Sequence, residues 1–170
     1  TYCILAFNNL GYHLHLMQDP RARSYAEMGL KMAIEKGMLA PQTYLYSTLG
    51  EIALAEGDLD AAEQSFRKGL SLSERLAIGE RIAGLNANLG RVAYLRGQNT
   101  LAIHLLSSAL TRAEALGTHH LAAQIRIWLA PLLPLREARR QLSLAREFAA
   151  QGGRKLLLQQ VEEAEKSLPS

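Results

Sequence analysis

The sequence has little cysteine and no long apolar run, and both shortages exclude classes of protein. Cys3 is the only cysteine among 170 residues, so an internal disulfide and a multi-cysteine zinc site are excluded. The longest apolar stretch, 128–135, contains two prolines and is far shorter than the roughly 18 residues of a membrane span. No secretory leader is recognisable. We therefore expect a cytoplasmic protein that does not enter a membrane.

Motifs of catalysis are also missing. The sequence contains no phosphate-binding loop, dinucleotide-binding glycine motif, zinc-protease helix or nucleophile elbow. Ser65 and Lys68 have the spacing found in some serine acyl enzymes, but the companion motifs are absent and Phe66 between them belongs to an apolar helix pattern. The histidines do not converge on one site in register: His13, His15, His104, His119 and His120. We expect no enzyme, no bound metal and no cofactor.

What is present is a repeat. A Leu-Gly pair recurs at intervals of 39 and 40 residues, and a Leu-Ala pair follows after 40 more: Leu10-Gly11, Leu49-Gly50, Leu89-Gly90 and Leu129-Ala130. Such a period is typical of stacked helix hairpins. We predict an all-α superhelical solenoid with hairpins over 1–37, 38–77, 78–117 and 118–153, and a polar capping helix over 154–167. The helical pattern begins at once, so we expect a piece of a longer protein.

Each hairpin has a predicted crossing point. A glycine inside a helix costs roughly 0.5–1 kcal/mol relative to alanine, so glycines in register indicate that a second helix approaches closely. The small residues Ala22, Ala62 and Ala102 are predicted to lie opposite. Because overfilling such a contact costs about 1–3 kcal/mol, we expect Gly50→Leu and Ala62→Leu to destabilise the protein.

Turn residues predict where the helices begin and end. Glycine is expected after the helix ends, at Gly37, Gly57, Gly97 and Gly117. Predicted N-terminal caps are Asp58, Asn99 and Thr118, and Pro41 suits the first turn of a helix. In the fourth repeat, Pro131-Leu132-Leu133-Pro134 replaces the usual turn. We predict a first helix shortened there by roughly one turn, with Pro134 beginning the second.

These positions resemble the tetratricopeptide repeat over residues 4–153. The shared features are a leucine and a small residue in the first helix, a Gly-Asp-like turn, and alanine, a large apolar and a small residue in the second. The long units resemble the sensor arms of MalT-like, LuxR-type and AfsR-type bacterial regulators. The closing proline is absent, and Leu14, Ala53 and Ala93 replace the usual tyrosine. The resemblance implies a right-handed superhelix that binds a protein or peptide, as a sensor or scaffold arm in signalling or transcription.

The resemblance also implies which residues face a partner. In the family, the residue before the leucine and the residue after the glycine point into the concave groove. The corresponding residues are Asn9, Tyr12, Thr48, Glu51, Asn88 and Arg91, followed by Trp128 and Pro131. Asparagine there resembles the peptide-holding asparagines of tetratricopeptide receptors, and Asn8, His15 and Tyr94 are expected nearby. The alternative is that all are solvent-facing helix residues.

Charge leaves further alternatives open. The net charge is only +3, but residues 119–155 carry seven cations against two glutamates. This stretch is either a site for an acidic partner or nucleic acid, or a solvated face on which Arg140 and its neighbours pair with carboxylates. Self-association through the last helix or an end repeat is a further alternative. Trp128 is expected to be buried against the last helix.

Overall fold

The computed structural model describes residues 2–169, and within that range the chain forms nine α-helices and one short 3-10 helix. Their bounds are α1 (Tyr2–Leu16), α2 (Ala22–Glu35), α3 (Leu39–Ala55), α4 (Leu59–Arg75), α5 (Gly79–Leu95), α6 (Asn99–Ala115), α7 (His119–Leu129), η1 (Ala130–Leu132), α8 (Leu135–Gln151) and α9 (Lys155–Ser167).

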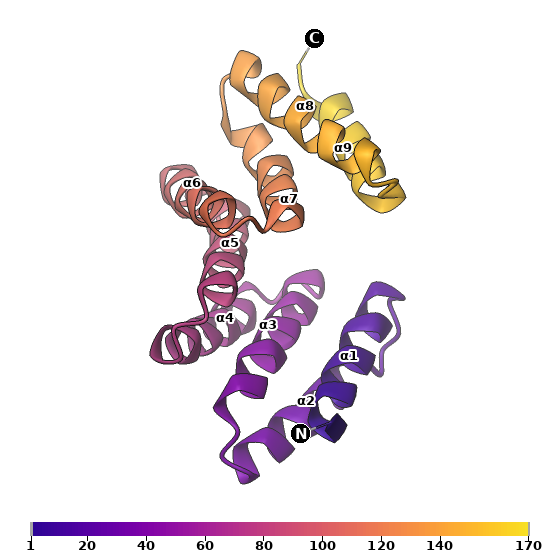
Figure 1. The fold of residues 1–170 in the computed structure, drawn as a ribbon, viewed down its shortest axis with the longest axis vertical. Helices are drawn as coiled ribbons and strands as arrows, with labels where there is room; N and C mark the ends of the chain where they lie inside the picture. The colour runs from indigo at the N-terminus through magenta and orange to yellow at the C-terminus, as the bar shows by residue number, and fades with distance from the viewer. Residues whose placement is uncertain (1, 170) are drawn as a thin grey trace.

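Consecutive helices pack against each other along the whole described chain. In addition, each odd-numbered helix from α1 to α5 touches the next odd-numbered one. Figure 1 shows the result: the stack curves, and α1 and α9 end on the same side of the arc. The predicted all-α superhelical solenoid is therefore confirmed. No helix among residues 2–169 combines the length and apolarity needed to cross a membrane.

The glycine crossings exist, but the residue that fills them differs from the prediction. A methyl group added at Gly50 would overlap the ring of Phe66, and one at Gly90 would lie 2.8 Å from Cγ of Leu106. Ala62 and Ala102 are fully buried but lie one helical turn earlier, so they are not the nearest neighbours. Only at Gly11 is an alanine, Ala26, the closest side chain. In the second and third hairpins, the first helix needs glycine because a large side chain, Phe66 or Leu106, fills the crossing.

The second set of small residues joins one hairpin to the next. A Cβ at Gly29 would lie 2.9 Å from Leu45, and one at Gly69 would lie 3.3 Å from Leu85. Leu49 and Leu89 are 7% and 8% exposed because a preceding hairpin covers them, whereas Leu10, in the first hairpin, is 41% exposed. Burial at this position therefore depends on the neighbouring repeat.

The helix ends follow the predicted glycines. Gly37, Gly57, Gly97 and Gly117 all have positive φ, between 63° and 81°. Asp58 accepts a hydrogen bond from the backbone N–H of Ala61 at 3.0 Å and caps α4 as predicted. The prediction for Asn99 is wrong, because Asn99 is the first residue of α6 and Gln98 is the N-cap. Thr118 is the N-cap residue of α7 as predicted, but its hydroxyl donates backwards to the carbonyl of Ala113 at 3.0 Å and makes no capping hydrogen bond.

The last part of the chain is shorter and differently covered. Helix α7 has 11 residues where α5 has 17, and η1 continues it before Pro134 precedes α8. Helix α9 buries Leu157 and Val161 against Leu142 and Ala145 of α8. The shortened helix and the final helix were both predicted. Together with η1, the first helix spans 119–132 against 79–95 for α5, so the loss is close to the predicted single turn.

Candidate binding cleft on the inner face

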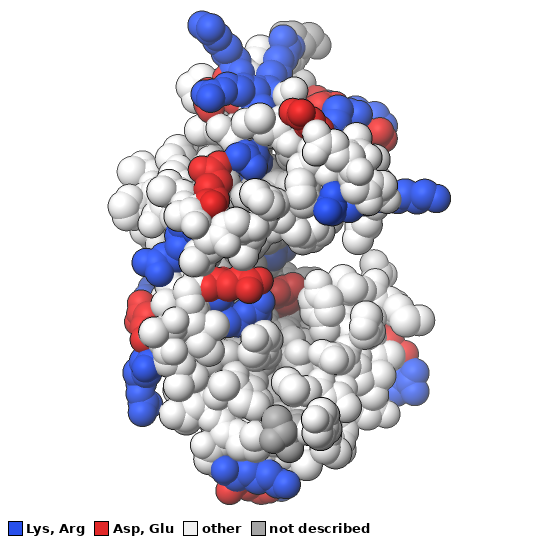
Figure 2. Space-filling view, in the orientation of Figure 1, with Lys and Arg blue, Asp and Glu red and all other residues white. Residues whose placement is uncertain are grey.

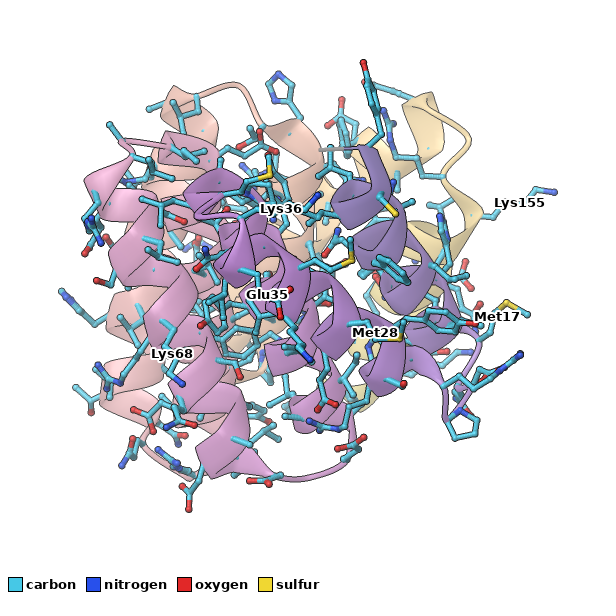
Figure 3. All side chains as sticks on the ribbon, turned by 90° about the horizontal axis from the view of Figure 1, so that it is seen from below. Met17, Met28, Glu35, Lys36, Lys68 and Lys155 are labelled. Atoms are coloured by element: carbon cyan, nitrogen blue, oxygen red, sulfur yellow. The ribbon has the colours of Figure 1, made fainter. Side chains whose placement is uncertain are left out.

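The inner face of the arc carries a cleft of about 810 Å³. Side chains from α1, α3, α5 and α7 line it, together with the start of α9. Figure 2 shows the indentation at mid-height, with charged side chains of both signs beside it. Figure 3 shows Met17, just after α1, and Lys155, at the start of α9, at the same edge of the molecule, with Lys155 extending away from the body. The curvature therefore brings the two ends of the stack to opposite sides of one cleft.

The structure divides the predicted partner-binding residues into two groups. Tyr12, Glu51 and Arg91, which follow the repeat glycines, line the cleft. The residues that precede the leucines do not: Asn9 is exposed elsewhere, and Thr48 and Asn88 are 4% and 5% exposed. In the fourth repeat the pattern reverses: Trp128, before the alanine that replaces glycine, lines the cleft, and Pro131, after it, is exposed outside the cleft. Of the residues expected nearby, His15 lines the cleft, Tyr94 is exposed outside it and Asn8 is buried.

The buried polar residues connect the first helices of successive repeats. Thr48 Oγ1 donates to Asn8 Oδ1 at 3.0 Å, and Asn88 Nδ2 donates to Glu51 Oε1 at 3.5 Å. Arg91 then donates to Asn88 Oδ1 at 3.1 Å. Buried polar groups need such partners. The amide of Asn88 is thus already used within the chain, and it orients Glu51 and Arg91 in the cleft.

Arg91 continues this connection to the fourth repeat. Its guanidinium carbon lies 4.5 Å from the centre of the Trp128 ring. Burial lowers the pKa of Arg91, and the neighbouring Glu51 carboxylate opposes that shift, so the guanidinium stays charged. Trp128 packs with the core residues of α5, α6 and α7. The prediction that Trp128 packs against the last helix is wrong, because the curved stack turns the indole towards Arg91.

Tyr12 lies among the charges of the cleft. Burial raises the pKa of the Tyr12 hydroxyl, and the Glu51 carboxylate raises it further, while Arg81 and Arg91 act in the opposite direction. The phenol is therefore held in its neutral form close to groups from α3 and α5. As a neutral donor and acceptor with an aromatic face, it suits contact with a partly polar ligand.

Two cleft arginines were missed from the sequence. Arg81, in the first turn of α5, lies over the Tyr44 ring at 4.5 Å, and Arg154, just before α9, lies over the Phe148 ring at 3.9 Å. Both line the same cleft as Arg91. Tyr44 and Arg81 are 37 positions apart in the sequence, and so are Arg91 and Trp128. A separation of nearly one repeat is therefore a sequence signal for such arginine–ring pairs. Nothing in the sequence indicates that Arg154 reaches the same place.

The histidines and the basic stretch have different environments. His15, His119 and His120 line the cleft from α1 and α7, but no group of three potential metal ligands occurs among residues 2–169. In the basic stretch, several arginines pair with carboxylates: Arg126 with Glu114 at 2.5 Å, Arg140 with Glu137 at 3.5 Å, and Arg146 with Glu165 at 2.5 Å. For these three, the interpretation as a paired surface holds.

No protein-family model matches the sequence, and no curated protein matches it either. The helix pairing, the 40-residue period and the cleft nevertheless define a class of protein. The chain is an all-helical repeat solenoid whose inner face carries a charged, aromatic-lined cleft.

Proposed function

We propose that this chain is an interaction module that binds a protein or peptide segment in the inner-face cleft. The observation that carries the proposal is the convergence of inward side chains from four first helices on a cleft of about 810 Å³. Specific ligand sites commonly have volumes of about 300–1,000 Å³. The side chains that line the cleft project mainly from helices, and buried hydrogen bonds hold some of them in place. Little side-chain entropy is therefore lost when a partner binds.

We further propose that the module is of the tetratricopeptide type with long helices. Support comes from the Leu-Gly register, the small residues at the crossings and the positive-φ glycine turns. On this proposal the chain serves as the sensor or scaffold arm of a bacterial signalling or transcriptional regulator. Regulatory domains in the same reading frame would support this assignment, and a reading frame that encodes only an unrelated enzyme would contradict it.

The single tryptophan makes the binding proposal testable without a label. Trp128 lies in the cleft beneath Arg91, so a peptide that enters the cleft is expected to change its fluorescence. Peptides are first selected from a random decapeptide library displayed on beads. The double variant Asn88→Ala with Arg91→Ala removes the cleft guanidinium and the buried amide that orients it, and is then expected to lose binding. Circular dichroism checks that the variant retains the helices.

The matched control is Arg112→Ala, because Arg112 is exposed on α6 and lies outside the cleft. It is expected to bind the selected peptides as the parent chain does. Selected peptides that bind the double variant equally well, with no change in Trp128 emission, would exclude the cleft as the site.

Self-association is the second candidate. Leu10 occupies the position at which Leu49 and Leu89 are covered by a preceding hairpin, yet it is exposed. Met28 also lies exposed on α2 and faces the viewer in Figure 3. A second copy of the chain that covers this apolar face would give a dimer in light scattering, and Leu10→Lys would return it to a monomer. A monomer at high concentration contradicts this candidate.

A further inference from the structure

Three of the four Lys and Arg residues that line the cleft are arginines with the same kind of ring contact. Arg81, Arg91 and Arg154 all line it, and each guanidinium lies over an aromatic ring, with carbon-to-centre distances of 4.5, 4.5 and 3.9 Å. A cation over an aromatic face is attracted to it. This contact restricts the position of each guanidinium at the side of the cleft.

These arginines lack the carboxylate partners that others in the chain have. Within residues 2–169, none of the three comes within 4.0 Å of an Asp or Glu oxygen, whereas Arg96, Arg126 and Arg146 outside the cleft all do. Other arginines outside the cleft, such as Arg112, also make no salt bridge among the described residues, so the absence of a partner distinguishes the cleft arginines only together with their ring contacts and their convergence. The inner cleft retains cations that no acidic side chain neutralises directly.

Most of their hydrogen-bond donors are also free. A guanidinium has five N–H donors. Arg91 uses one of them on Asn88, and Arg154 uses one on the carbonyl of Phe148. Among the described residues, no fully buried side-chain nitrogen or oxygen lacks a partner. The guanidinium nitrogens of Arg81, Arg91 and Arg154 that make no hydrogen bond among the described residues are therefore at least partly accessible, and all three residues line the cleft.

Such a fixed, unpaired guanidinium is suited to a carboxylate, which it binds through two parallel hydrogen bonds. We propose that the cleft selects peptide segments bearing Asp or Glu side chains, and that Arg81, Arg91 and Arg154 bind their carboxylates. This inference rests on the proposed function and names the chemistry of the partner.

The same cleft contains Glu51 and Glu80 beside Tyr12. These groups favour a peptide over a nucleic acid. A peptide offers backbone N–H donors to the glutamates between its acidic side chains, whereas every unit of a nucleic acid carries a phosphate that the glutamates repel.

The test begins with the same random decapeptide library. The expected result is enrichment of Asp and Glu in the captured peptides. For one enriched peptide, affinity is measured through Trp128 emission and compared with that of its counterpart in which Asn and Gln replace Asp and Glu. The counterpart is expected to bind about ten-fold more weakly or worse, because charge-assisted hydrogen bonds are lost. Affinity for the acidic peptide is also expected to fall as salt is added.

The variants assign this loss to particular side chains. Arg81→Gln and Arg154→Gln are each expected to weaken the acidic peptide about ten-fold, and neither is expected to weaken its neutral counterpart. Among residues 2–169, Arg81 makes no side-chain hydrogen bond and no salt bridge, and its contact with Tyr44 is at the edge of the cleft, so its removal is not expected to disturb folding. Arg112→Gln removes an exposed arginine outside the cleft and is expected to change nothing.

The outcomes separate the two proposals. A library from which no peptide is enriched overturns the proposed function together with this inference. Enriched peptides without acidic side chains overturn the inference alone, as does acidic-peptide binding that Arg81→Gln and Arg154→Gln leave unchanged. A single-stranded oligonucleotide that displaces the acidic peptide at equal concentration would show selection for negative charge in general and would also overturn it.

Discussion

At the residue scale, one turn position departs from the glycine pattern. Gly37 and Gly117 end the second helices of their hairpins with φ of 63° and 68°, and Ala77, 40 residues from each, has φ of 53°. A left-handed conformation costs a residue with a Cβ roughly 1–2 kcal/mol. The same strain applies to Gln18, at the position of Gly57 in the first hairpin. Ala77 and Gln18 adopt this conformation because the packing of the helices on both sides of the turn imposes it.

Ala77→Gly is therefore expected to stabilise the protein. Relief of strain exceeds the additional chain entropy of glycine, which leaves a gain of about 0.5–1 kcal/mol in the free energy of unfolding. Urea denaturation measures this change. The reverse substitution at the equivalent site, Gly117→Ala, is expected to destabilise by a similar amount. A less stable Ala77→Gly variant would show that the turn is not strained.

A second prediction at this scale concerns the ionisation of Tyr12. Burial, and then Glu51, raise the pKa of its hydroxyl above the ordinary value of 10.0. When a folded-state pKa is raised, the associated stability is present below the unfolded pKa and is lost as the pH rises. The parent chain is therefore expected to lose stability faster than Tyr12→Phe above pH 10. The difference in phenolate absorbance between the two proteins gives the Tyr12 titration directly, and a midpoint below 10 would contradict the prediction.

At the scale of secondary-structure elements, the helix crossing can be separated from helix propensity. Gly50 and Gly84 are both inside long first helices, α3 and α5. A Cβ at Gly50 would overlap the Phe66 ring from α4, whereas one at Gly84 would have only Leu121 nearby, at 4.0 Å. The two glycines therefore differ in packing but share the propensity cost.

Gly50→Ala is expected to destabilise by about 1–3 kcal/mol because Phe66 has to move. Gly84→Ala is expected to stabilise by about 0.5–1 kcal/mol, the usual advantage of alanine in a helix. Thermal and urea unfolding of both variants provide the comparison. Equal effects at the two positions would mean that close approach of α3 and α4 is not the reason for the glycine.

At the scale of the whole molecule, stability is expected to be distributed along the stack. Each hairpin contacts mainly its neighbours, so a solenoid behaves as a chain of coupled units. Leu142 is 1% exposed in the cluster that joins α8 to α9, and Phe66 belongs to a separate cluster in the second and third hairpins. A defect at one end is therefore expected to have a mainly local effect.

Leu142→Ala is expected to cost about 2–5 kcal/mol and to accelerate amide hydrogen exchange most strongly in α8 and α9. Exchange in α3 and α4 is expected to change much less. Hydrogen exchange followed by mass spectrometry resolves these segments. Uniform acceleration over the described helices would indicate one cooperative core and would contradict the repeat description of stability.

The sequence by itself determined the helical repeat, because its signals are local. The recurrence of Leu-Gly, the glycine turns and the Asp58 cap all depend on residues within one hairpin. Of the candidate site, it indicated the inward series Tyr12, Glu51 and Arg91, since these residues hold the same register in three repeats. It did not separate Asn88 from them, because the partner that satisfies its amide lies in another repeat.

Only the tertiary structure decided what shares the cleft. The curvature of the stack is the sum of small rotations between hairpins, and it brings Arg154 and the start of α9 into the same cleft as Tyr12 and His15 of α1. The same geometry places Trp128 beneath Arg91 instead of against α9. Leu10 is exposed because no hairpin of the described residues covers it as one covers Leu49 and Leu89. The local sequence pattern sets the angles within a hairpin, whereas the residues that meet across the arc depend on all of the inter-hairpin contacts together.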